Sequence, residues 1–165
     1  MRYPSPAVEV PDDLGALVER LVAVHVGTRD AGLVPDEVMA AAALFDAEQR
    51  RLTVYLPVAT SATSLANLRE NGAIAVVLSQ PLTHRTVQLK GRVEEIRPAR
   101  EEERESVERH AAGFDAEVEA IGLPPAVVKR RTRWPCHAVT FVVAEAYEQT
   151  PGPRAGEPIE GGGAP

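Results

Sequence analysis

Short runs of apolar residues, separated by clusters of turn-forming residues, recur along most of the chain. Four runs have the length and the β-branched content that are typical of strands, and they cover residues 21–29, 52–58, 73–79 and 87–96. A longer strand is expected over residues 136–149, where apolar residues occupy both faces. The pattern therefore predicts a protein built mainly of β-strands.

Residues 37–46 form an ambiguous run. Four consecutive alanines favour a helix by intrinsic propensity, but the run is short and lies between two strand-like runs. We therefore predict a strand that pairs with residues 52–58 in a β-hairpin. A second hairpin is expected between residues 73–79 and 87–96, which are joined by a polar turn.

Three segments indicate helices. A short helix is expected after Pro11, and a helix of two to three turns is expected within residues 58–72, with a stop at Asn71 and Gly72. A longer charged helix is expected from Pro98 onward. Apolar residues recur along it at steps of three and four, which predicts a buried face made of Val107, Ala111, Phe114, Val118 and Ile121.

The order of these elements predicts a single domain, mainly β with some α. Strands separated by turn signals, with one helix inserted midway, favour a closed or half-open barrel over a parallel sheet. We expect a split β-barrel of about six antiparallel strands with flanking helices over residues 11–149. Residues 1–10 are expected to be a loose arm. The Pro/Gly-rich residues 150–165 are expected to be extended or disordered, or to lie across a partner subunit.

Charge and composition narrow the classes of partner. The 165 residues carry a formal net charge of −6, which argues against a surface built to attract nucleic acid or an anionic membrane. No apolar run approaches the roughly 20 residues that span a bilayer, and the N-terminus lacks a secretory pattern. Cys136 is the single cysteine, which favours a reducing compartment. We expect a cytoplasmic protein.

Several common kinds of site have no counterpart in the sequence. It contains no dinucleotide-binding glycine motif, no phosphate loop ending in Gly-Lys-Ser/Thr and no Gly-x-Ser-x-Gly. The four histidines are scattered singly, so no metal site is predicted. Cys136 and His137 are neighbours on a strand and point to opposite faces, which argues against a nucleophile–base pair.

Hydroxyl residues at the entrance of the helix expected within residues 58–72 are the first candidates for a binding site. They are Thr60, Ser61, Thr63 and Ser64. Backbone N–H groups at a helix entrance favour a phosphate, and hydroxyl groups add donors. A single Ser or Thr would also serve as an ordinary N-cap, so both interpretations remain open.

The polar face of the last hairpin strand is the second candidate. Alternation places His84, Thr86, Gln88, Lys90 and Arg92 on one face. Ordinary solvent exposure produces the same alternation, so this face is either a surface or the border of a ligand site. Gly91 suits a bulge or a close backbone approach.

The order of motifs over residues 52–96 resembles that of the pyridoxamine 5'-phosphate oxidase family. It consists of a strand with Tyr55, a loop of small residues, a helix ending in Leu-Arg-Glu-Asn, an apolar strand, a turn, and Arg-x-Val-x-Leu-x-Gly from Arg85 to Gly91. Residues 22–35 look like the first strand and turn of that family. The resemblance covers roughly residues 14–147 in order.

This resemblance implies a split barrel that binds flavin mononucleotide (FMN) at the interface of a homodimer. The activity it implies is that of an FMN-dependent oxidoreductase acting on a small molecule that the sequence does not identify. FAD is an alternative cofactor. The cofactor-binding residues implied are Thr60, Ser61, Thr63, Ser64, His84, Arg85, Thr86 and Lys90.

The sequence departs from the family pattern at its basic positions. The family commonly places Arg-Lys where alignment on Asn71 puts Thr63 and Ser64, and the basic residues of its second strand are replaced here by an apolar run. Arg85 and Lys90 are left to neutralise a phosphate. We therefore do not expect oxidation of pyridoxamine 5'-phosphate itself. The alternative expectation is a non-catalytic barrel that binds, stores or senses flavin, haem or a deazaflavin.

Overall fold

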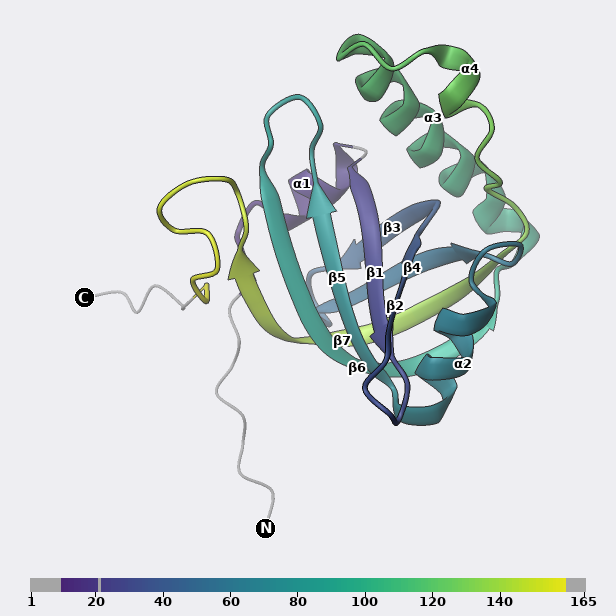
Figure 1. Ribbon diagram of the computed structural model, residues 1–165, viewed down its shortest axis with the longest axis vertical. Helices are drawn as coiled ribbons and strands as arrows, with labels where there is room; N and C mark the ends of the chain where they lie inside the picture. Colours follow the sequence, from purple (N-terminus) through teal and green to yellow (C-terminus); the bar gives the residue numbers. More distant parts are fainter. Residues whose placement is uncertain (1–9, 21, 160–165) are drawn as a thin grey trace.

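The structure, a computed structural model, describes residues 10–20 and 22–159 (Figure 1). Its centre is a curled antiparallel sheet of seven strands in the order β2-β1-β5-β6-β7-β4-β3. The strands are β1 (Ala23–Arg29), β2 (Pro35–Met39), β3 (Ala42–Asp46), β4 (Arg51–Pro57), β5 (Ala73–Ser79), β6 (Thr86–Pro98) and β7 (Cys136–Glu148). The predicted split β-barrel is confirmed, with seven strands where about six were expected.

Helices flank this sheet. They are α1 (Leu14–Glu19), α2 (Ala62–Asn71), α3 (Arg104–Ala120) and α4 (Pro125–Val128), with a short 3-10 helix η1 (Glu101–Glu103) before α3. None of the helices in the described ranges is long and apolar enough to cross a membrane.

The run predicted as one strand over residues 37–46 belongs to two strands. β2 pairs with β1, whereas β3 pairs with β4 at the other edge of the sheet. Between them, Ala40 N–H donates to Val24 O and Ala41 N–H donates to Tyr55 O, each at 2.8 Å. The chain therefore crosses directly from one edge strand of the curled sheet to the other. The prediction of one strand was wrong because a sequence pattern does not show that the pairing partner changes.

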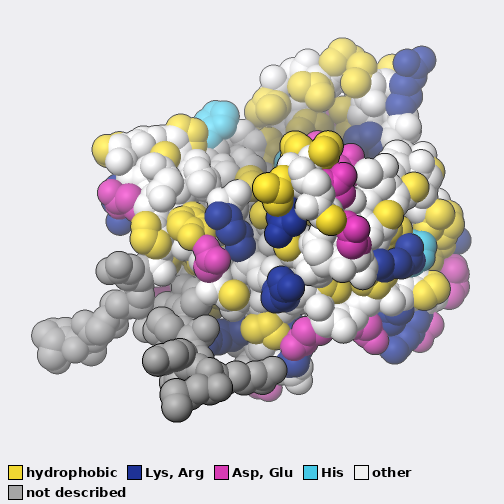
Figure 2. Space-filling model, turned by 60° about the horizontal axis from the view of Figure 1, so that its bottom comes forward, with side chains coloured by type: hydrophobic (Ala, Val, Ile, Leu, Met, Phe, Trp, Pro, Cys, Tyr) yellow, Lys and Arg dark blue, Asp and Glu magenta, His cyan; other side chains and the backbone are white. Residues whose placement is uncertain are grey.

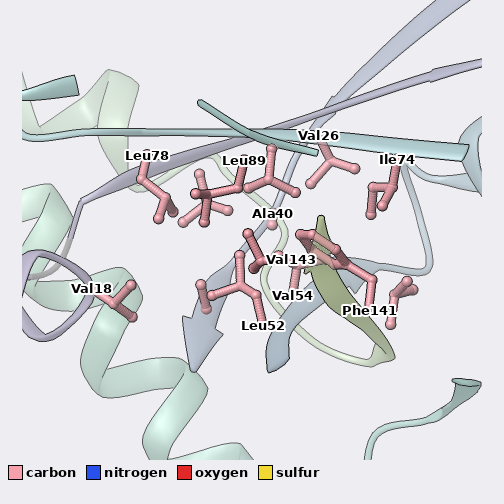
Figure 3. Packing of buried hydrophobic residues seen from close by; sticks show 14 of the residues in the cluster. Val18, Val26, Ala40, Leu52, Val54, Ile74, Leu78, Leu89, Phe141 and Val143 are labelled. Carbon is pink, nitrogen blue, oxygen red and sulfur yellow. The ribbon is translucent and has the colours of Figure 1, made fainter. Parts of the chain in front are cut away.

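Apolar side chains from the strands fill the barrel interior (Figure 3). Alternate residues point inward, so Val76 and Leu78 of β5 and Leu89 of β6 are fully buried. Burying each such side chain contributes about 1.5–3 kcal/mol to stability. The apolar face of α1, which includes Leu14 and Val18, covers one end of the barrel as part of the same cluster.

The helix predicted after residue 58 is α2, and its end was correctly placed. Gly72 adopts a left-handed conformation with φ 68° and its N–H donates to Leu68 O. The Asn71 side-chain amide donates to Arg29 O at 2.7 Å, and its oxygen accepts from Ala73 N–H at 2.9 Å. The helix terminus is thereby tied to both β1 and β5.

The charged helix begins later than predicted. Pro98 still pairs with His137 in the β6–β7 ladder, so the strand occupies the position at which the helix was expected to start. α3 begins at Arg104 and ends at Ala120. The predicted buried face is confirmed except at Ile121, which is 52% exposed because it lies beyond the last helical residue.

Residues 150–159 turn back along the end of β7. Pro158 forms a bridge with Tyr147, and Ile159 N–H donates to Ala146 O at 2.8 Å. Ile159 also packs against the barrel core. The predicted N-terminal arm, apart from residue 10, and residues 160–165 lie outside the described residues.

A β-bulge interrupts the β6–β7 ladder at Gly91. Lys90 pairs with Glu145 but Gly91 pairs with Val143, so Ala144 is an extra residue on β7. A Cβ atom at Gly91 would lie 2.1 Å from the carbonyl oxygen of Val142. The close backbone approach predicted at Gly91 is confirmed.

An ion pair joins β6 to the start of α3. The Arg97 guanidinium binds both carboxylate oxygens of Glu103 at 2.7 Å, and Tyr55 Oη–H donates to the same carboxylate at 3.0 Å. The Arg100 N–H adds a fourth hydrogen bond. Arg97 is the main reason that the pKa of Glu103 is lowered to about 2.

Replacing Gly91 should destabilise the barrel. We expect Gly91→Ala to lower the free energy of unfolding by about 1–3 kcal/mol, because the new methyl group has no room beside Val142. Urea denaturation measures this. Gly15→Ala is the matched control: nothing lies within 4 Å of the added atom in α1, so it should be neutral or stabilising. Equal stability of Gly91→Ala and wild type would contradict the account of the bulge.

Removing the Glu103 charge should change how stability depends on pH. The lowered pKa of Glu103 means that its contribution is complete above about pH 4.5 and is lost as the pH falls toward 2. Glu103→Gln should therefore lose about 1–3 kcal/mol at neutral pH and show a flatter stability profile between pH 4.5 and 2. Glu101→Gln, at a mostly exposed carboxylate, is the control. Parallel pH profiles for wild type and Glu103→Gln would disprove the assignment.

Candidate functional site

A groove of about 700 Å³ lies on the outer face of the barrel, across β1, β5, β6 and β7. Small-molecule sites typically enclose roughly 300–1,000 Å³, so its size is sufficient for a ligand. The bulge at Ala144 lies within it, beside Gly91. The groove is therefore located where the regular sheet is interrupted.

The floor of the groove is flat because its outward-facing residues are small. Gly27 pairs with Ala75 across β1 and β5, and Ala73 lies on the same face two residues earlier in β5. A Cβ atom at Gly27 would have only Ala75 O within 4 Å, at 3.7 Å, so the space above it is open. Four adjacent strands give a surface about 14 Å wide. A planar ring could lie on it parallel to the sheet.

Basic side chains border this floor. Arg29, Lys90 and Arg92 line the groove together with one carboxylate, Glu145, which gives a formal charge of +2 from three cations and one anion. Within the part of the chain that the structure describes, none of these three cations forms a salt bridge; Arg29 donates to Asp30 O at 3.2 Å. In a protein with a net charge of −6, this concentration of unpaired cations favours an anionic ligand.

Tyr147 contacts two of the residues that line the groove, Lys90 and Glu145. The Lys90 ammonium lies 4.6 Å from the centroid of its ring, a cation–π contact. The Tyr147 hydroxyl donates to Glu145, and that hydrogen bond raises the pKa of Tyr147. Lys90 and Glu145 are therefore held close to one residue without being paired to each other. Figure 2 shows Lys and Arg side chains near the middle of one face of the molecule, with Asp and Glu side chains among them.

The hydroxyl residues predicted at the helix entrance are divided between interior and surface. Ser61 and Ser64 are fully buried: Ser61 Oγ donates to Pro57 O at 2.7 Å, and Ser64 Oγ donates to Asp36 Oδ2 at 2.6 Å. Thr60 and Thr63 are exposed. Neither Ser side chain caps the helix, and both hydroxyl protons satisfy acceptors within the protein.

The predicted residues of the second hairpin lie at its turn. Arg85 Nη1 binds Glu148 Oε2 at 2.7 Å and Nη2 binds Asp13 Oδ1 at 3.2 Å. Burial of Arg85 opposes its charge, but these two carboxylates outweigh it and raise the pKa of Arg85. Thr86 Oγ1 donates to the backbone oxygen of His84, whose side chain is exposed. Arg85 thus connects the turn to α1 and to the end of β7.

The structure does not bring the helix entrance and the hairpin turn together within one chain. α2 leads into the beginning of β5, whereas the turn follows the end of β5, about 23 Å away along the strand (Figure 1). Lys90 lies between them, in the groove. Of the predicted cofactor-binding residues, Lys90 is the one that lines the groove.

Sequence analysis did not select Arg29 or the small residues of the floor. Arg29 is the last residue of a predicted strand, where the sequence pattern indicates only the start of a turn. The available signal was that Gly27, Ala73 and Ala75 occupy outward positions at which strands usually carry larger side chains. That signal becomes specific only when β1 and β5 are known to be neighbours.

Comparison with known proteins identifies the fold. No protein-family model and no curated protein matches the sequence. Among solved structures, HupZ of Group A Streptococcus has a TM-score of 0.56 at 16% identity, covering 90% of this chain and 100% of that one. An F420 reductase has a TM-score of 0.55 at 19% identity, covering 83% and 98%.

A third structure connects the fold with the resemblance seen in the sequence. It is a Lactobacillus delbrueckii protein provisionally described as a pyridoxamine 5'-phosphate oxidase, with a TM-score of 0.53 at 12% identity, covering 84% of this chain and 93% of that one. The resemblance recognised over residues 52–96 is thereby confirmed at the level of the fold.

Proposed function

We propose that this chain binds FMN in the groove on the outer face of its barrel and acts as an FMN-dependent oxidoreductase. The observation that carries the proposal is a flat floor of Gly27, Ala73 and Ala75 bordered by cations without salt-bridge partners among the described residues. A planar ring would lie on the floor, and a phosphate would be neutralised at the rim. The bound flavin would supply the hydride-transfer chemistry.

The residues of the groove fit such a ligand. Lys90 and Arg92 are two residues apart on β6 and so share the outer face, and Ala73 pairs with Arg92 across the ladder. Arg29 ends β1 at the same side of the sheet. The guanidinium groups of Arg29 and Arg92 would bind the phosphate, and guanidinium–phosphate contacts are among the strong charge-assisted hydrogen bonds. The fold that the chain shares with a provisionally described pyridoxamine 5'-phosphate oxidase supports the assignment.

A non-catalytic carrier or sensor is the second candidate. Ser61, Ser64 and Arg85 are engaged by protein acceptors, which leaves fewer donors for a phosphate than the sequence predicted. The same rim cations would also bind the carboxylates of haem or the acidic groups of a deazaflavin. A purified protein that holds pigment but shows no turnover with reduced nicotinamides across a substrate panel would favour this function.

We also propose that the protein is a homodimer in which a second copy covers the open side of the groove. The exposed Ala144, which lines the groove, and the half-buried Val142 give β7 an apolar strip that extends from the groove. Light scattering at micromolar protein concentration should give the mass of a dimer. A monomer at all concentrations up to the millimolar range would contradict this.

A titration of the protein with FMN, followed by quenching of flavin fluorescence, tests the proposed site. Ala75→Leu should weaken binding about tenfold or more by filling the floor, and Lys90→Gln should weaken it about tenfold by removing a cation. The matched controls are Ala112→Leu on the exposed surface of α3 and Lys129→Gln, which removes the other lysine of the chain. Equal affinities in all four variants, or no binding by the wild type, would refute the site.

A further inference from the structure

Two polar residues next to Gly27, outside the lining of the groove, form a pair that the function proposed above does not use. His25 Nδ1 lies 2.7 Å from Glu37 Oε1. In the β1–β2 ladder, Gly27 lies opposite Glu37, and Val26 between the two β1 residues is buried in the core. Because alternate residues of a strand share a face, His25 and Gly27 both lie on the outer face. The pair therefore belongs to the same surface as the floor.

The space above Gly27, the residue of the floor nearest this pair in the ladder, is open. Gly27 lines the groove, and a Cβ atom built on it would meet only Ala75 O within 4 Å. His25 is two residues from Gly27, about 7 Å along the strand. Met39, which pairs with His25, packs against residues of α3 and α4. The two helices therefore lie next to the His25 end of β1. A ring on the floor would thus meet His25 at its end.

The hydrogen bond to Glu37 determines which nitrogen can meet a ligand. With Nδ1 engaged by Glu37, Nε2 is the remaining polar atom of the His25 ring. It accepts a hydrogen bond when the imidazole is neutral and donates one when it is charged. Flavins and deazaflavins carry a ring edge on which an N–H lies between two carbonyl groups. Such an edge can pair with Nε2 in either state.

We propose that His25, positioned by Glu37, hydrogen-bonds the N–H/C=O edge of the ring and so fixes the direction in which the ligand lies in the groove. The inference rests on the proposed function. Arg29 lies four residues from His25 on the same face of β1, about 13 Å away. The ring edge would point toward His25 and the phosphate toward Arg29. His25 is thus a ligand-contacting residue and Glu37 a positioning residue.

The test compares FMN with its N3-methyl analogue, in which the edge N–H is replaced by a methyl group. Wild-type protein should bind the analogue about tenfold more weakly than FMN, because one hydrogen bond is lost and a methyl group meets the imidazole. His25→Ala should bind FMN about tenfold more weakly than wild type does. The ratio of the two dissociation constants should fall close to one in His25→Ala, since both causes of discrimination are removed.

Controls separate this role from a structural one. The side chains of His25 and Glu37 are 46% and 58% exposed, so substitutions there should leave the fold intact, which thermal unfolding checks. His84→Asn, at the exposed hairpin turn, should keep the wild-type ratio, and Glu37→Ala should give an intermediate ratio. An unchanged ratio in His25→Ala overturns this inference alone. Failure of wild type to bind either ligand overturns the proposed function and this inference with it.

Discussion

The curl of the sheet into a half-barrel depends on one extended segment that changes its hydrogen-bonding partner midway. The backbone N–H of Ala40 donates to β1 and that of Ala41 donates to β4, and only a few per cent of the surface of either residue is exposed. Small residues suit this junction because two sheet edges approach each other there and close-packed interiors leave no room for larger groups. β2 and β3 remain the two edge strands of the sheet, and the junction between them holds β1 and β4 close enough for the apolar faces of the strands to enclose a common core.

The same strands that enclose the core also present the groove. Their side chains alternate, so Val26 and Val76 point inward while Gly27 and Ala75 form the outer floor. α1 covers an end of the barrel, and α3 with α4 packs near Ala23 at one end of β1. The outer faces of β1, β5, β6 and β7 are thus left available beyond these helices (Figure 1). Core and candidate site are therefore two sides of a single sheet.

Sequence reasoning succeeded where the physical cause is local. The runs at residues 73–79 and 87–96 are strands because their side chains alternate or are continuously apolar, and the stop at Gly72 follows from its left-handed conformation. It failed where the cause is a distant partner. The continuation of β6 to Pro98 depends on pairing with β7, and Arg85 is occupied by carboxylates from residues 13 and 148. Lys90 was selected from its own strand, but the floor beside it required knowledge that β1 and β5 are neighbours.

The position of β7 in the sheet has a consequence for how the chain folds during synthesis. This last strand lies between β6 and β4, so the ladder on both of its sides is missing until residues 136–148 have left the ribosome. β4 and β6 then present unpaired backbone to other chains, which is the situation in which strand edges aggregate. The nascent protein consequently depends on β7 to cover these strands, and a message truncated within α3 would yield a product in which β4 and β6 are exposed edges in addition to β2 and β3.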